Sequence, residues 1–123
     1  MSNSQNRKIR VYCAGKLNDM ACDYTKNVSR MCKCAIEVQK CGFAVYVPGI
    51  DLLMGLIAGD YEYNDYFDNS QAWLEVSDAV FLTPGWETSQ GTKREIGLAE
   101  SLGIPVFEDL YTMKGYFNAV YKK

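Results

Sequence analysis

Histidine is absent from this chain of 123 residues. Its absence excludes Ser–His and Cys–His catalytic dyads, zinc sites built on imidazole, and pH switches that depend on histidine. Acid–base chemistry in this protein must therefore come from Asp, Glu, Tyr, Lys or Cys side chains.

The chain also lacks a surplus of basic residues and any long apolar run. Its 13 Lys and Arg are outnumbered by 15 Asp and Glu, and the sequence pI is about 5.1, so we expect no nucleic-acid partner. Residues 1–8 contain no apolar signal segment, and no run of about 18 apolar residues follows. We therefore expect no membrane partner and a cytoplasmic location, which is the host cytoplasm if a phage encodes the chain.

The five cysteines have neither an even count nor the CxxC spacing of redox and zinc sites. They are Cys13, Cys22, Cys32, Cys34 and Cys41. This pattern favours small buried side chains in a reducing compartment over a disulfide framework. We expect no metal site and no cofactor.

The residues that are present have the composition of one globular domain. The chain is 48% hydrophobic and 23% charged, which argues against disorder. A chain of this length buries roughly two-thirds of its surface on folding, enough for a core without disulfides or metals. We predict a flexible N-terminus at residues 1–8 and a single domain over residues 9–123.

Strand-like and helix-like segments alternate along this domain. β-rich runs at 9–13, 43–47, 79–82 and 104–107 predict strands, and apolar residues at helical spacing predict helices at 25–41, 68–76, 91–102 and 110–121. Residues 52–57 fit a short helix or an apolar loop. The continuous apolar run at 79–82 is typical of a parallel strand covered on both faces. We predict the α/β class, a single Rossmann-like domain with an open parallel sheet of about four to five strands and helices on both faces.

Four aromatic side chains crowd the segment 61–67 between two of these elements. They are Tyr61, Tyr63, Tyr66 and Phe67. Rigid aromatic side chains suit three roles here: packing on the surface of the domain, forming a lid over a site, or contacting a second subunit.

Open parallel sheets bind ligands beyond the carboxyl ends of their strands. Four predicted loops lie there, at 13–18, 48–51, 83–90 and 107–110. The third leads into a helix whose start carries Ser89, Gly91 and Thr92, where unpaired backbone amides favour an anionic or hydroxyl-rich ligand. Glu95, one turn further on, fits two roles: a catalytic carboxylate facing the crevice, or the capping-box partner of Thr92.

Two stretches of the chain contain sequence motifs that resemble those of a known family. They are Val11-Tyr12-Cys13-Ala14-Gly15 and the run 78–99, which contains Pro84-Gly85-Trp86, Ser89-x-Gly91 and Glu95. Together they resemble the nucleoside 2-deoxyribosyltransferase-like proteins, especially a small phage and bacterial branch, over about residues 9–110. The resemblance implies a Rossmann-like fold and cleavage or transfer at the N-glycosidic bond of a (deoxy)nucleoside or nucleoside monophosphate. It places the attacking carboxylate at Glu95, where it would stabilise or trap the oxocarbenium-like sugar, and the orienting tyrosine at Tyr12.

The resemblance also implies a set of ligand-binding residues. They are Ala14, Gly15, Lys16, Gly85, Trp86, Ser89, Gly91, Thr92, Asp68 and Asn69. Ser89 stands where the transferases carry an acidic residue, which favours a nucleoside monophosphate over a free nucleoside. The second acidic residue of the family falls at Asp68, Asn69 or Ser70. Because relatives complete their pockets from a neighbouring subunit, we expect a homo-oligomer, a dimer or higher.

Three functions fit these observations. An enzyme would release a base or transfer a sugar through Glu95. A non-catalytic nucleotide-binding protein on the same fold would act as a sensor, or as a phage-type sponge for a nucleotide or a cyclic ADP-ribose-like signal. A weaker similarity of Pro84-Gly85 and Gly91-Thr92-x-x-Glu95 to nucleotide phosphoribohydrolases and their ligand-sensing relatives fits either function. The third is an oligomeric scaffold with an empty pocket.

Overall fold

Four parallel strands form the centre of the protein, in the spatial order β2-β1-β3-β4. The computed structural model describes residues 7–17 and 21–121. The strands are β1 (Arg10–Ala14), β2 (Ala44–Tyr46), β3 (Ala79–Leu82) and β4 (Val106–Phe107). Residue Val11 of β1 pairs with Val45 on one side and Ala79 on the other, so β1 lies inside the sheet.

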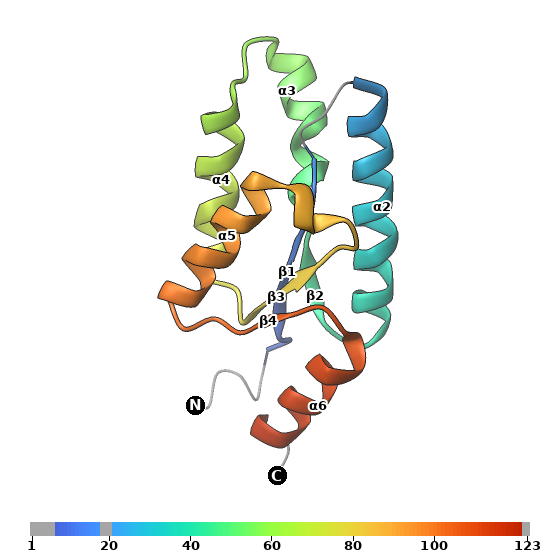
Figure 1. Cartoon of the computed structure of the whole chain (residues 1–123), viewed down its shortest axis with the longest axis vertical. Coiled ribbons are helices and arrows are strands. Elements are labelled where there is room, and N and C mark those ends of the chain that lie inside the picture. The colour runs from blue at the N-terminus through green and yellow to red at the C-terminus, as the bar shows by residue number, and fades with distance from the viewer. Residues whose placement is uncertain (1–6, 18–20, 122–123) are drawn as a thin grey trace.

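Helices connect the strands and lie on both sides of the sheet (Figure 1). The α-helices are α2 (Ala21–Lys40), α3 (Leu52–Ala58), α4 (Tyr63–Glu75), α5 (Gln90–Ser101) and α6 (Leu110–Tyr121). Two short 3-10 turns, η1 (Pro48–Asp51) and η2 (Trp86–Thr88), precede α3 and α5. No helix in residues 7–17 and 21–121 combines the length and the apolar character that a membrane span needs.

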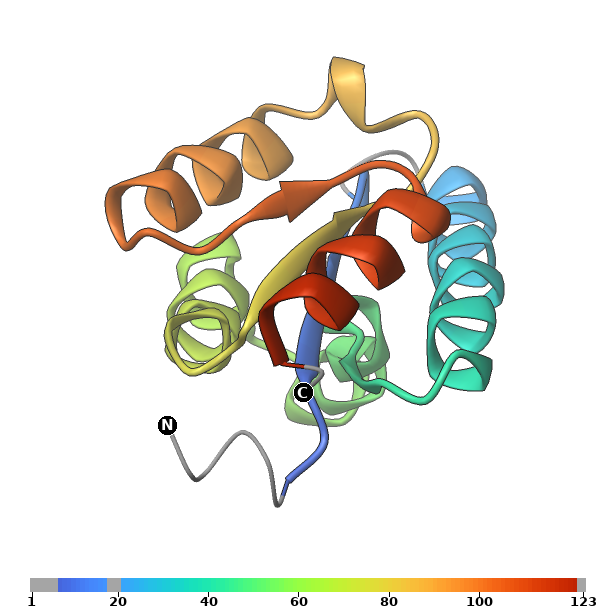
Figure 2. The same cartoon turned by 90° about the horizontal axis from the view of Figure 1, so that it is seen from below.

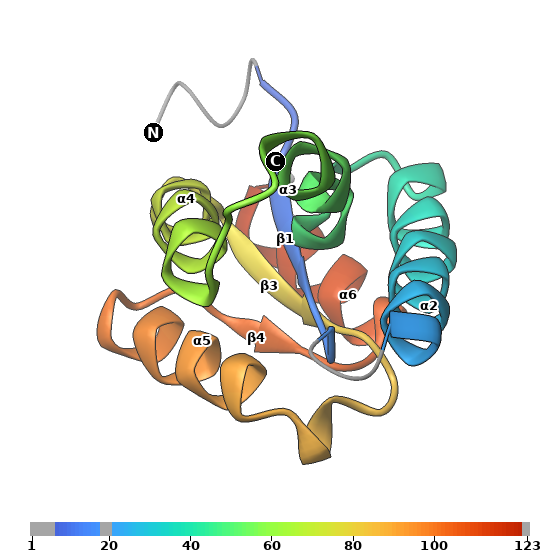
Figure 3. The same cartoon turned by 90° about the horizontal axis from the view of Figure 1, so that it is seen from above.

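The two faces of the sheet have separate hydrophobic cores because alternate strand residues point to opposite sides. Val11 and Cys13 of β1 pack with residues of α2 and α6. Tyr12 and Ala14 pack instead with Leu74 of α4 and with residues of α5. The views along the vertical axis agree: α2 and α6 lie on one side of the sheet, and α4 and α5 on the other (Figures 2 and 3). This alternation directs Tyr12 towards α4 and α5.

The predicted α/β class and parallel sheet are confirmed, with four strands. The segment 52–57 is helical, within α3. The helix predicted at 68–76 begins earlier, at Tyr63, inside the aromatic segment. A capping box explains the early start: the backbone N–H of Glu62 donates to the Asp65 carboxylate at 2.7 Å, while the Glu62 side chain accepts from the N3 backbone.

The described cysteines lie in or against the hydrophobic core on the α2 side of the sheet. Cys13 is buried, and burial raises the pKa of its thiol to about 12, with smaller effects of Cys34 and Cys32. Cys32, Cys34 and Cys41 pack against the same core and are free thiols, as is Cys13. The side chain of Cys22, most of the predicted flexible N-terminus (1–6) and residue 18 of the first predicted loop lie outside the described residues.

Candidate functional site

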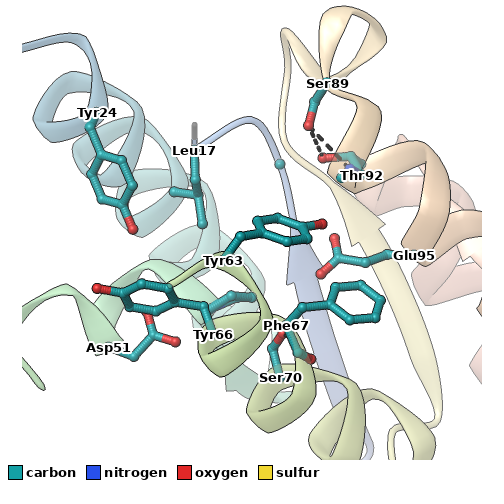
Figure 4. Close-up of a pocket in the computed structure, with 13 residues that line it drawn as sticks. Leu17, Tyr24, Asp51, Tyr63, Tyr66, Phe67, Ser70, Ser89, Thr92 and Glu95 are labelled. Carbon is teal, nitrogen blue, oxygen red and sulfur yellow. Dashed lines mark hydrogen bonds between the residues drawn. The ribbon is translucent and has the colours of Figure 1, made fainter. Parts of the chain in front are cut away.

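A cavity of about 90 Å³ lies at the carboxyl edge of the sheet, between α2, α4 and α5 (Figure 4). Its lining residues are Gly15, Leu17, Tyr24, Pro48, Asp51, Tyr63, Tyr66, Phe67, Ser70, Ser89, Gly91, Thr92 and Glu95. Three of the four predicted loops contribute to it: those after β1, β2 and β3. The cavity therefore occupies the crevice in which open parallel sheets bind their ligands.

Ser89 determines where α5 begins and what faces the cavity at its start. Its side-chain oxygen accepts hydrogen bonds from the backbone N–H of Thr92 at 3.1 Å and from the Thr92 hydroxyl at 2.9 Å. Ser89 is thus the N-cap, and Thr92 occupies the third helical position. Since Thr92 is not the cap, Glu95 does not act as its capping-box partner. The hydrogen bond of Glu95 runs to the sheet instead.

The hydroxyl of Tyr12 donates a hydrogen bond to Oε2 of Glu95. Tyr12 is fully buried on β1, and Glu95 enters the cavity from the second turn of α5. Burial raises the pKa of Tyr12 well above its usual value of 10, and the charge of Glu95 raises it further. The phenol therefore stays protonated across the physiological range and remains a donor to the carboxylate.

Burial raises the pKa of Glu95 from 4.5 to about 7, although the Tyr12 hydrogen bond acts in the opposite direction. The carboxyl group consequently changes its charge near neutral pH. Above about pH 7 it is a carboxylate that can attack an electrophilic carbon, and below that pH it is an acid that can donate a proton.

Ser70 is the residue of the helix before β3 that reaches this pair. It lines the cavity, and its hydroxyl interacts with that of Tyr12, which lowers the Tyr12 pKa against the effect of burial. The predicted candidates Asp68 and Asn69 lie away from the cavity on exposed faces of α4, and Asn69 donates to the Tyr46 hydroxyl at 3.3 Å. The difference follows from helical geometry, because α4 turns by about 100° per residue and faces the cavity at intervals of three and four.

Aromatic residues of α4 form one wall of the cavity, as Figure 4 shows for Tyr63, Tyr66 and Phe67. The Tyr63 ring stacks on Phe67 with centroids 5.9 Å apart and planes 19° apart. The Arg94 guanidinium lies 3.9 Å from the centroid of the Phe67 ring. The aromatic segment 61–67 therefore joins α4 to α5 beside Glu95 and offers flat apolar surfaces to a ligand.

A second carboxyl group, Asp51 of η1, lines the cavity beside Tyr24 and Tyr66. Burial raises its pKa from 3.8 to about 6. Burial, and then the charge of Asp51, raises the pKa of Tyr24 to about 12. Sequence reasoning placed Asp51 in a crevice loop without assigning it a role. It missed Tyr24 because this residue lies between the predicted loop at 13–18 and the predicted helix at 25–41, whereas α2 begins at Ala21. This end of the cavity offers a hydrogen-bond acceptor and two phenols.

The other predicted ligand residues divide between the cavity and its surroundings. Gly15 lines the cavity, where a Cβ atom would lie 2.8 Å from the Thr83 Cβ, so the close approach requires glycine. Ala14 is buried in the core, and Lys16 is partly buried next to Gly15 outside the lining.

Gly85 and Trp86 belong to the loop after β3. Gly85 has a φ of 95°, a left-handed conformation that favours glycine. Trp86 packs against the core that contains Tyr12 and Ala99, and its indole N–H donates to the Glu108 carboxylate at 3.4 Å. Neither residue is part of the cavity lining. These two residues therefore stabilise the loop and do not contact the cavity.

A comparison with family models identifies one match that spans most of the chain. The model of a domain of unknown function, DUF4406, matches residues 9–108. The matched segment contains β1 to β4 and every residue that lines the cavity. A search of curated proteins finds no match.

Proposed function

The chain belongs to the DUF4406 family, and from its cavity we propose that it cleaves or transfers the N-glycosidic bond of a (deoxy)nucleoside or nucleoside monophosphate. The observation that carries this proposal is the Glu95 carboxyl group, which faces the cavity while the Tyr12 hydroxyl orients it through Oε2. The resemblance to nucleoside 2-deoxyribosyltransferase-like proteins supports the substrate class.

In the proposed reaction, a carboxylate oxygen of Glu95 attacks the anomeric carbon of the sugar. The bond from this carbon to the base nitrogen breaks, the electron pair goes to the base, and the base takes a proton from water. The resulting glycosyl ester is then attacked at the same carbon by an acceptor base or by water, whose proton passes to solvent. Glu95 leaves as a carboxylate, so it is regenerated.

The sugar would lie in the cavity, with the phosphate and the base directed to its two polar ends. The cavity of about 90 Å³ is smaller than typical small-molecule sites of ~300–1,000 Å³, so it suits a sugar-sized group. The start of α5 at Ser89 favours a phosphate, because backbone amides of the first turn have no partner within the helix. The Asp51 end would accept hydrogen bonds from amino or imino groups of a base.

A second candidate is binding without turnover, as in a sensor or a sponge for a nucleotide signal. The observation that favours it is Ser89, which caps α5 where the resembling transferases carry an acidic residue. Such a protein would use the same aromatic wall and helix start to hold an intact ligand.

The experiment incubates the protein with nucleosides, nucleoside monophosphates and cyclic ADP-ribose-like compounds, and measures free base by chromatography. Glu95→Gln removes the nucleophile, and Glu100→Gln is the matched control, because Glu100 is exposed on the same helix. Base release by the native chain and Glu100→Gln, but not by Glu95→Gln, supports the enzyme.

Intact ligand recovered from the denatured native protein, with no base release, supports the binding protein instead. Release of base at the native rate by Glu95→Gln contradicts the proposed nucleophile. Mass spectrometry of the quenched reaction adds a direct test, since the glycosyl ester adds the mass of the sugar to the peptide that contains Glu95.

A further inference from the structure

Large apolar side chains lie exposed together on η1, on α3 and on the neighbouring face of α4. We call this surface the α3 face, and it consists of Ile50, Leu53, Met54, Leu56, Ile57 and Trp73. Between 52% and 78% of the surface of each residue is exposed. Figure 3 looks onto α3 and shows it on the outside of the molecule.

The α3 face contains a groove with a volume of about 500 Å³. Ile50, Leu53, Met54, Ile57 and Trp73 line it together with Tyr46, Val47, Asp51 and Asn69. Mainly apolar side chains therefore line the groove, and the rest of their own chain leaves them largely uncovered. Surfaces of this kind mark interaction sites.

We propose that the α3 face binds the same face of a second copy of this chain, forming a two-fold symmetric dimer. The exposed area of its six residues is on the order of 700–800 Å², close to the ~800 Å² that each partner contributes to a standard interface. The largest apolar patch on a typical monomer is about 300–600 Å². The α3 face thus exceeds what a monomer usually exposes and matches what a stable dimer buries.

The charge pattern favours a second copy over other occupants. Between residues 50 and 58 the one ionisable side chain is Asp51, which also lines the cavity. A two-fold axis places each residue near its own counterpart, so a patch without other charges meets itself without repulsion. A membrane surface fits poorly, because no Lys or Arg lies between 50 and 62 and Asp60 and Glu62 follow α3.

The contact differs from the one that the sequence suggested. A subunit contact was one of the three roles open to the aromatic segment 61–67, but Phe67 is buried in its own chain. The aromatic residue of the α3 face is Trp73 of α4. The aliphatic residues of α3 supply the remainder.

The dimer would also border the candidate site, because Asp51 lines both the groove and the cavity. A partner seated on the α3 face covers the groove side of Asp51 and limits the access of water to that end of the cavity. The dimer itself does not depend on the proposed N-glycosidic chemistry.

Light scattering and sedimentation equilibrium of the full chain at micromolar concentrations test the proposal. We expect twice the chain mass of 13.9 kDa. In Ile57→Glu a carboxylate would be buried without a partner at the interface, so we expect the dimer dissociation constant to rise about 100-fold or more. Tyr111→Glu is the matched control, since Tyr111 is almost fully exposed on α6, and it should remain dimeric.

Trp73 provides a second measurement that does not require a variant at the α3 face. In Trp86→Phe, Trp73 is the one remaining tryptophan of the two in the chain. Its emission should shift to longer wavelength on dilution, as the dimer dissociates and the indole becomes solvated. A native chain that keeps its monomer mass at micromolar concentration overturns the proposal. So does an Ile57→Glu variant that is folded, by circular dichroism, and remains a dimer with native affinity.

Discussion

Tyr12 and Glu95 are 83 residues apart in the chain, yet the Tyr12 hydroxyl donates a hydrogen bond to the Glu95 carboxylate. Tyr12 lies on β1 and Glu95 on α5, which packs on the same face of the sheet. This hydrogen bond therefore connects β1 to α5 at the cavity. It also couples two pKa values, because the carboxylate raises the pKa of Tyr12 and the phenol lowers that of Glu95.

Tyr12→Phe should raise the pKa of Glu95 above its native value of about 7. The variant removes the hydrogen bond that favours the charged carboxylate, whereas the effect of burial remains. A hydrogen bond to a charged group is worth ~1.5–3 kcal/mol, which corresponds to about one to two pKa units. NMR titration of the Glu95 carboxyl carbon measures the shift. Tyr111→Phe is the exposed control, and equal Glu95 pKa values in all three proteins would contradict the coupling.

Glu95→Gln should stabilise the protein at about pH 8 more than at about pH 5. The folded pKa of Glu95, about 7, lies above its ordinary value of 4.5. Its contribution to stability is therefore fully present below about pH 4.5 and is lost as the pH rises through about 7. Asp51, with a pKa raised to about 6, acts in the same direction but remains in both proteins.

Thermal unfolding at the two pH values checks this prediction. At about pH 8 we expect Glu95→Gln to melt a few degrees higher than the native chain, by about 3–6 °C per kcal/mol for a domain of this size. Glu100→Gln should show no such difference, because Glu100 is exposed. A melting difference that is independent of pH would mean that burial does not perturb Glu95.

Ser89→Ala should weaken both α5 and phosphate binding. Loss of the cap at Thr92 should lower the free energy of unfolding by about 1 kcal/mol. Affinity for a nucleoside monophosphate should fall, while affinity for the free nucleoside should change less. Calorimetric unfolding and titration measure the two effects. Ser101→Ala is the control at the other end of α5, where the hydroxyl bonds the Leu98 carbonyl. If the native chain binds nucleoside and monophosphate equally well, the phosphate assignment is wrong.

Gly55→Ala and Gly97→Ala should have opposite effects on stability. Both glycines lie within helices, where alanine is favoured by ~0.8–1.0 kcal/mol. A Cβ atom on Gly97 meets nothing within 4 Å, so that variant should be more stable. A Cβ atom on Gly55 would lie 2.7 Å from Cζ of Tyr66, which must move away from the cavity wall.

We expect Gly55→Ala to be destabilised by about 1–3 kcal/mol as a result of this overpacking. Urea unfolding of both variants measures the difference. A Gly55→Ala protein as stable as Gly97→Ala would show that Tyr66 moves without cost and does not anchor the wall of the cavity.

The order of elements was accessible from the sequence because local patterns determine it. The apolar run at 79–82 is a buried strand, and the segment 110–121 is a helix with the predicted bounds. Parallel strands place their carboxyl ends at one edge, so three of the four crevice loops were also found. Glu95 could be identified from its position in the motif, but capping and catalytic roles share the same spacing.

Tertiary structure alone decided which side chains meet at the site. The register of α4 depends on a capping box at Glu62, so the sequence did not select Ser70 over Asp68 and Asn69. Tyr24 and Asp51 reach the cavity because η1 contacts both α2 and α4 at the edge of the sheet, and no local pattern encodes that arrangement.

The α3 segment illustrates the same limit for burial. Its sequence, LLMGLIA, has the hydrophobicity of a core helix, yet Leu53, Leu56 and Ile57 lie exposed. Hydrophobicity determines for which side chains transfer out of water lowers the free energy. Whether a surface is available to cover them depends on how the whole chain packs, and here their own chain leaves them uncovered.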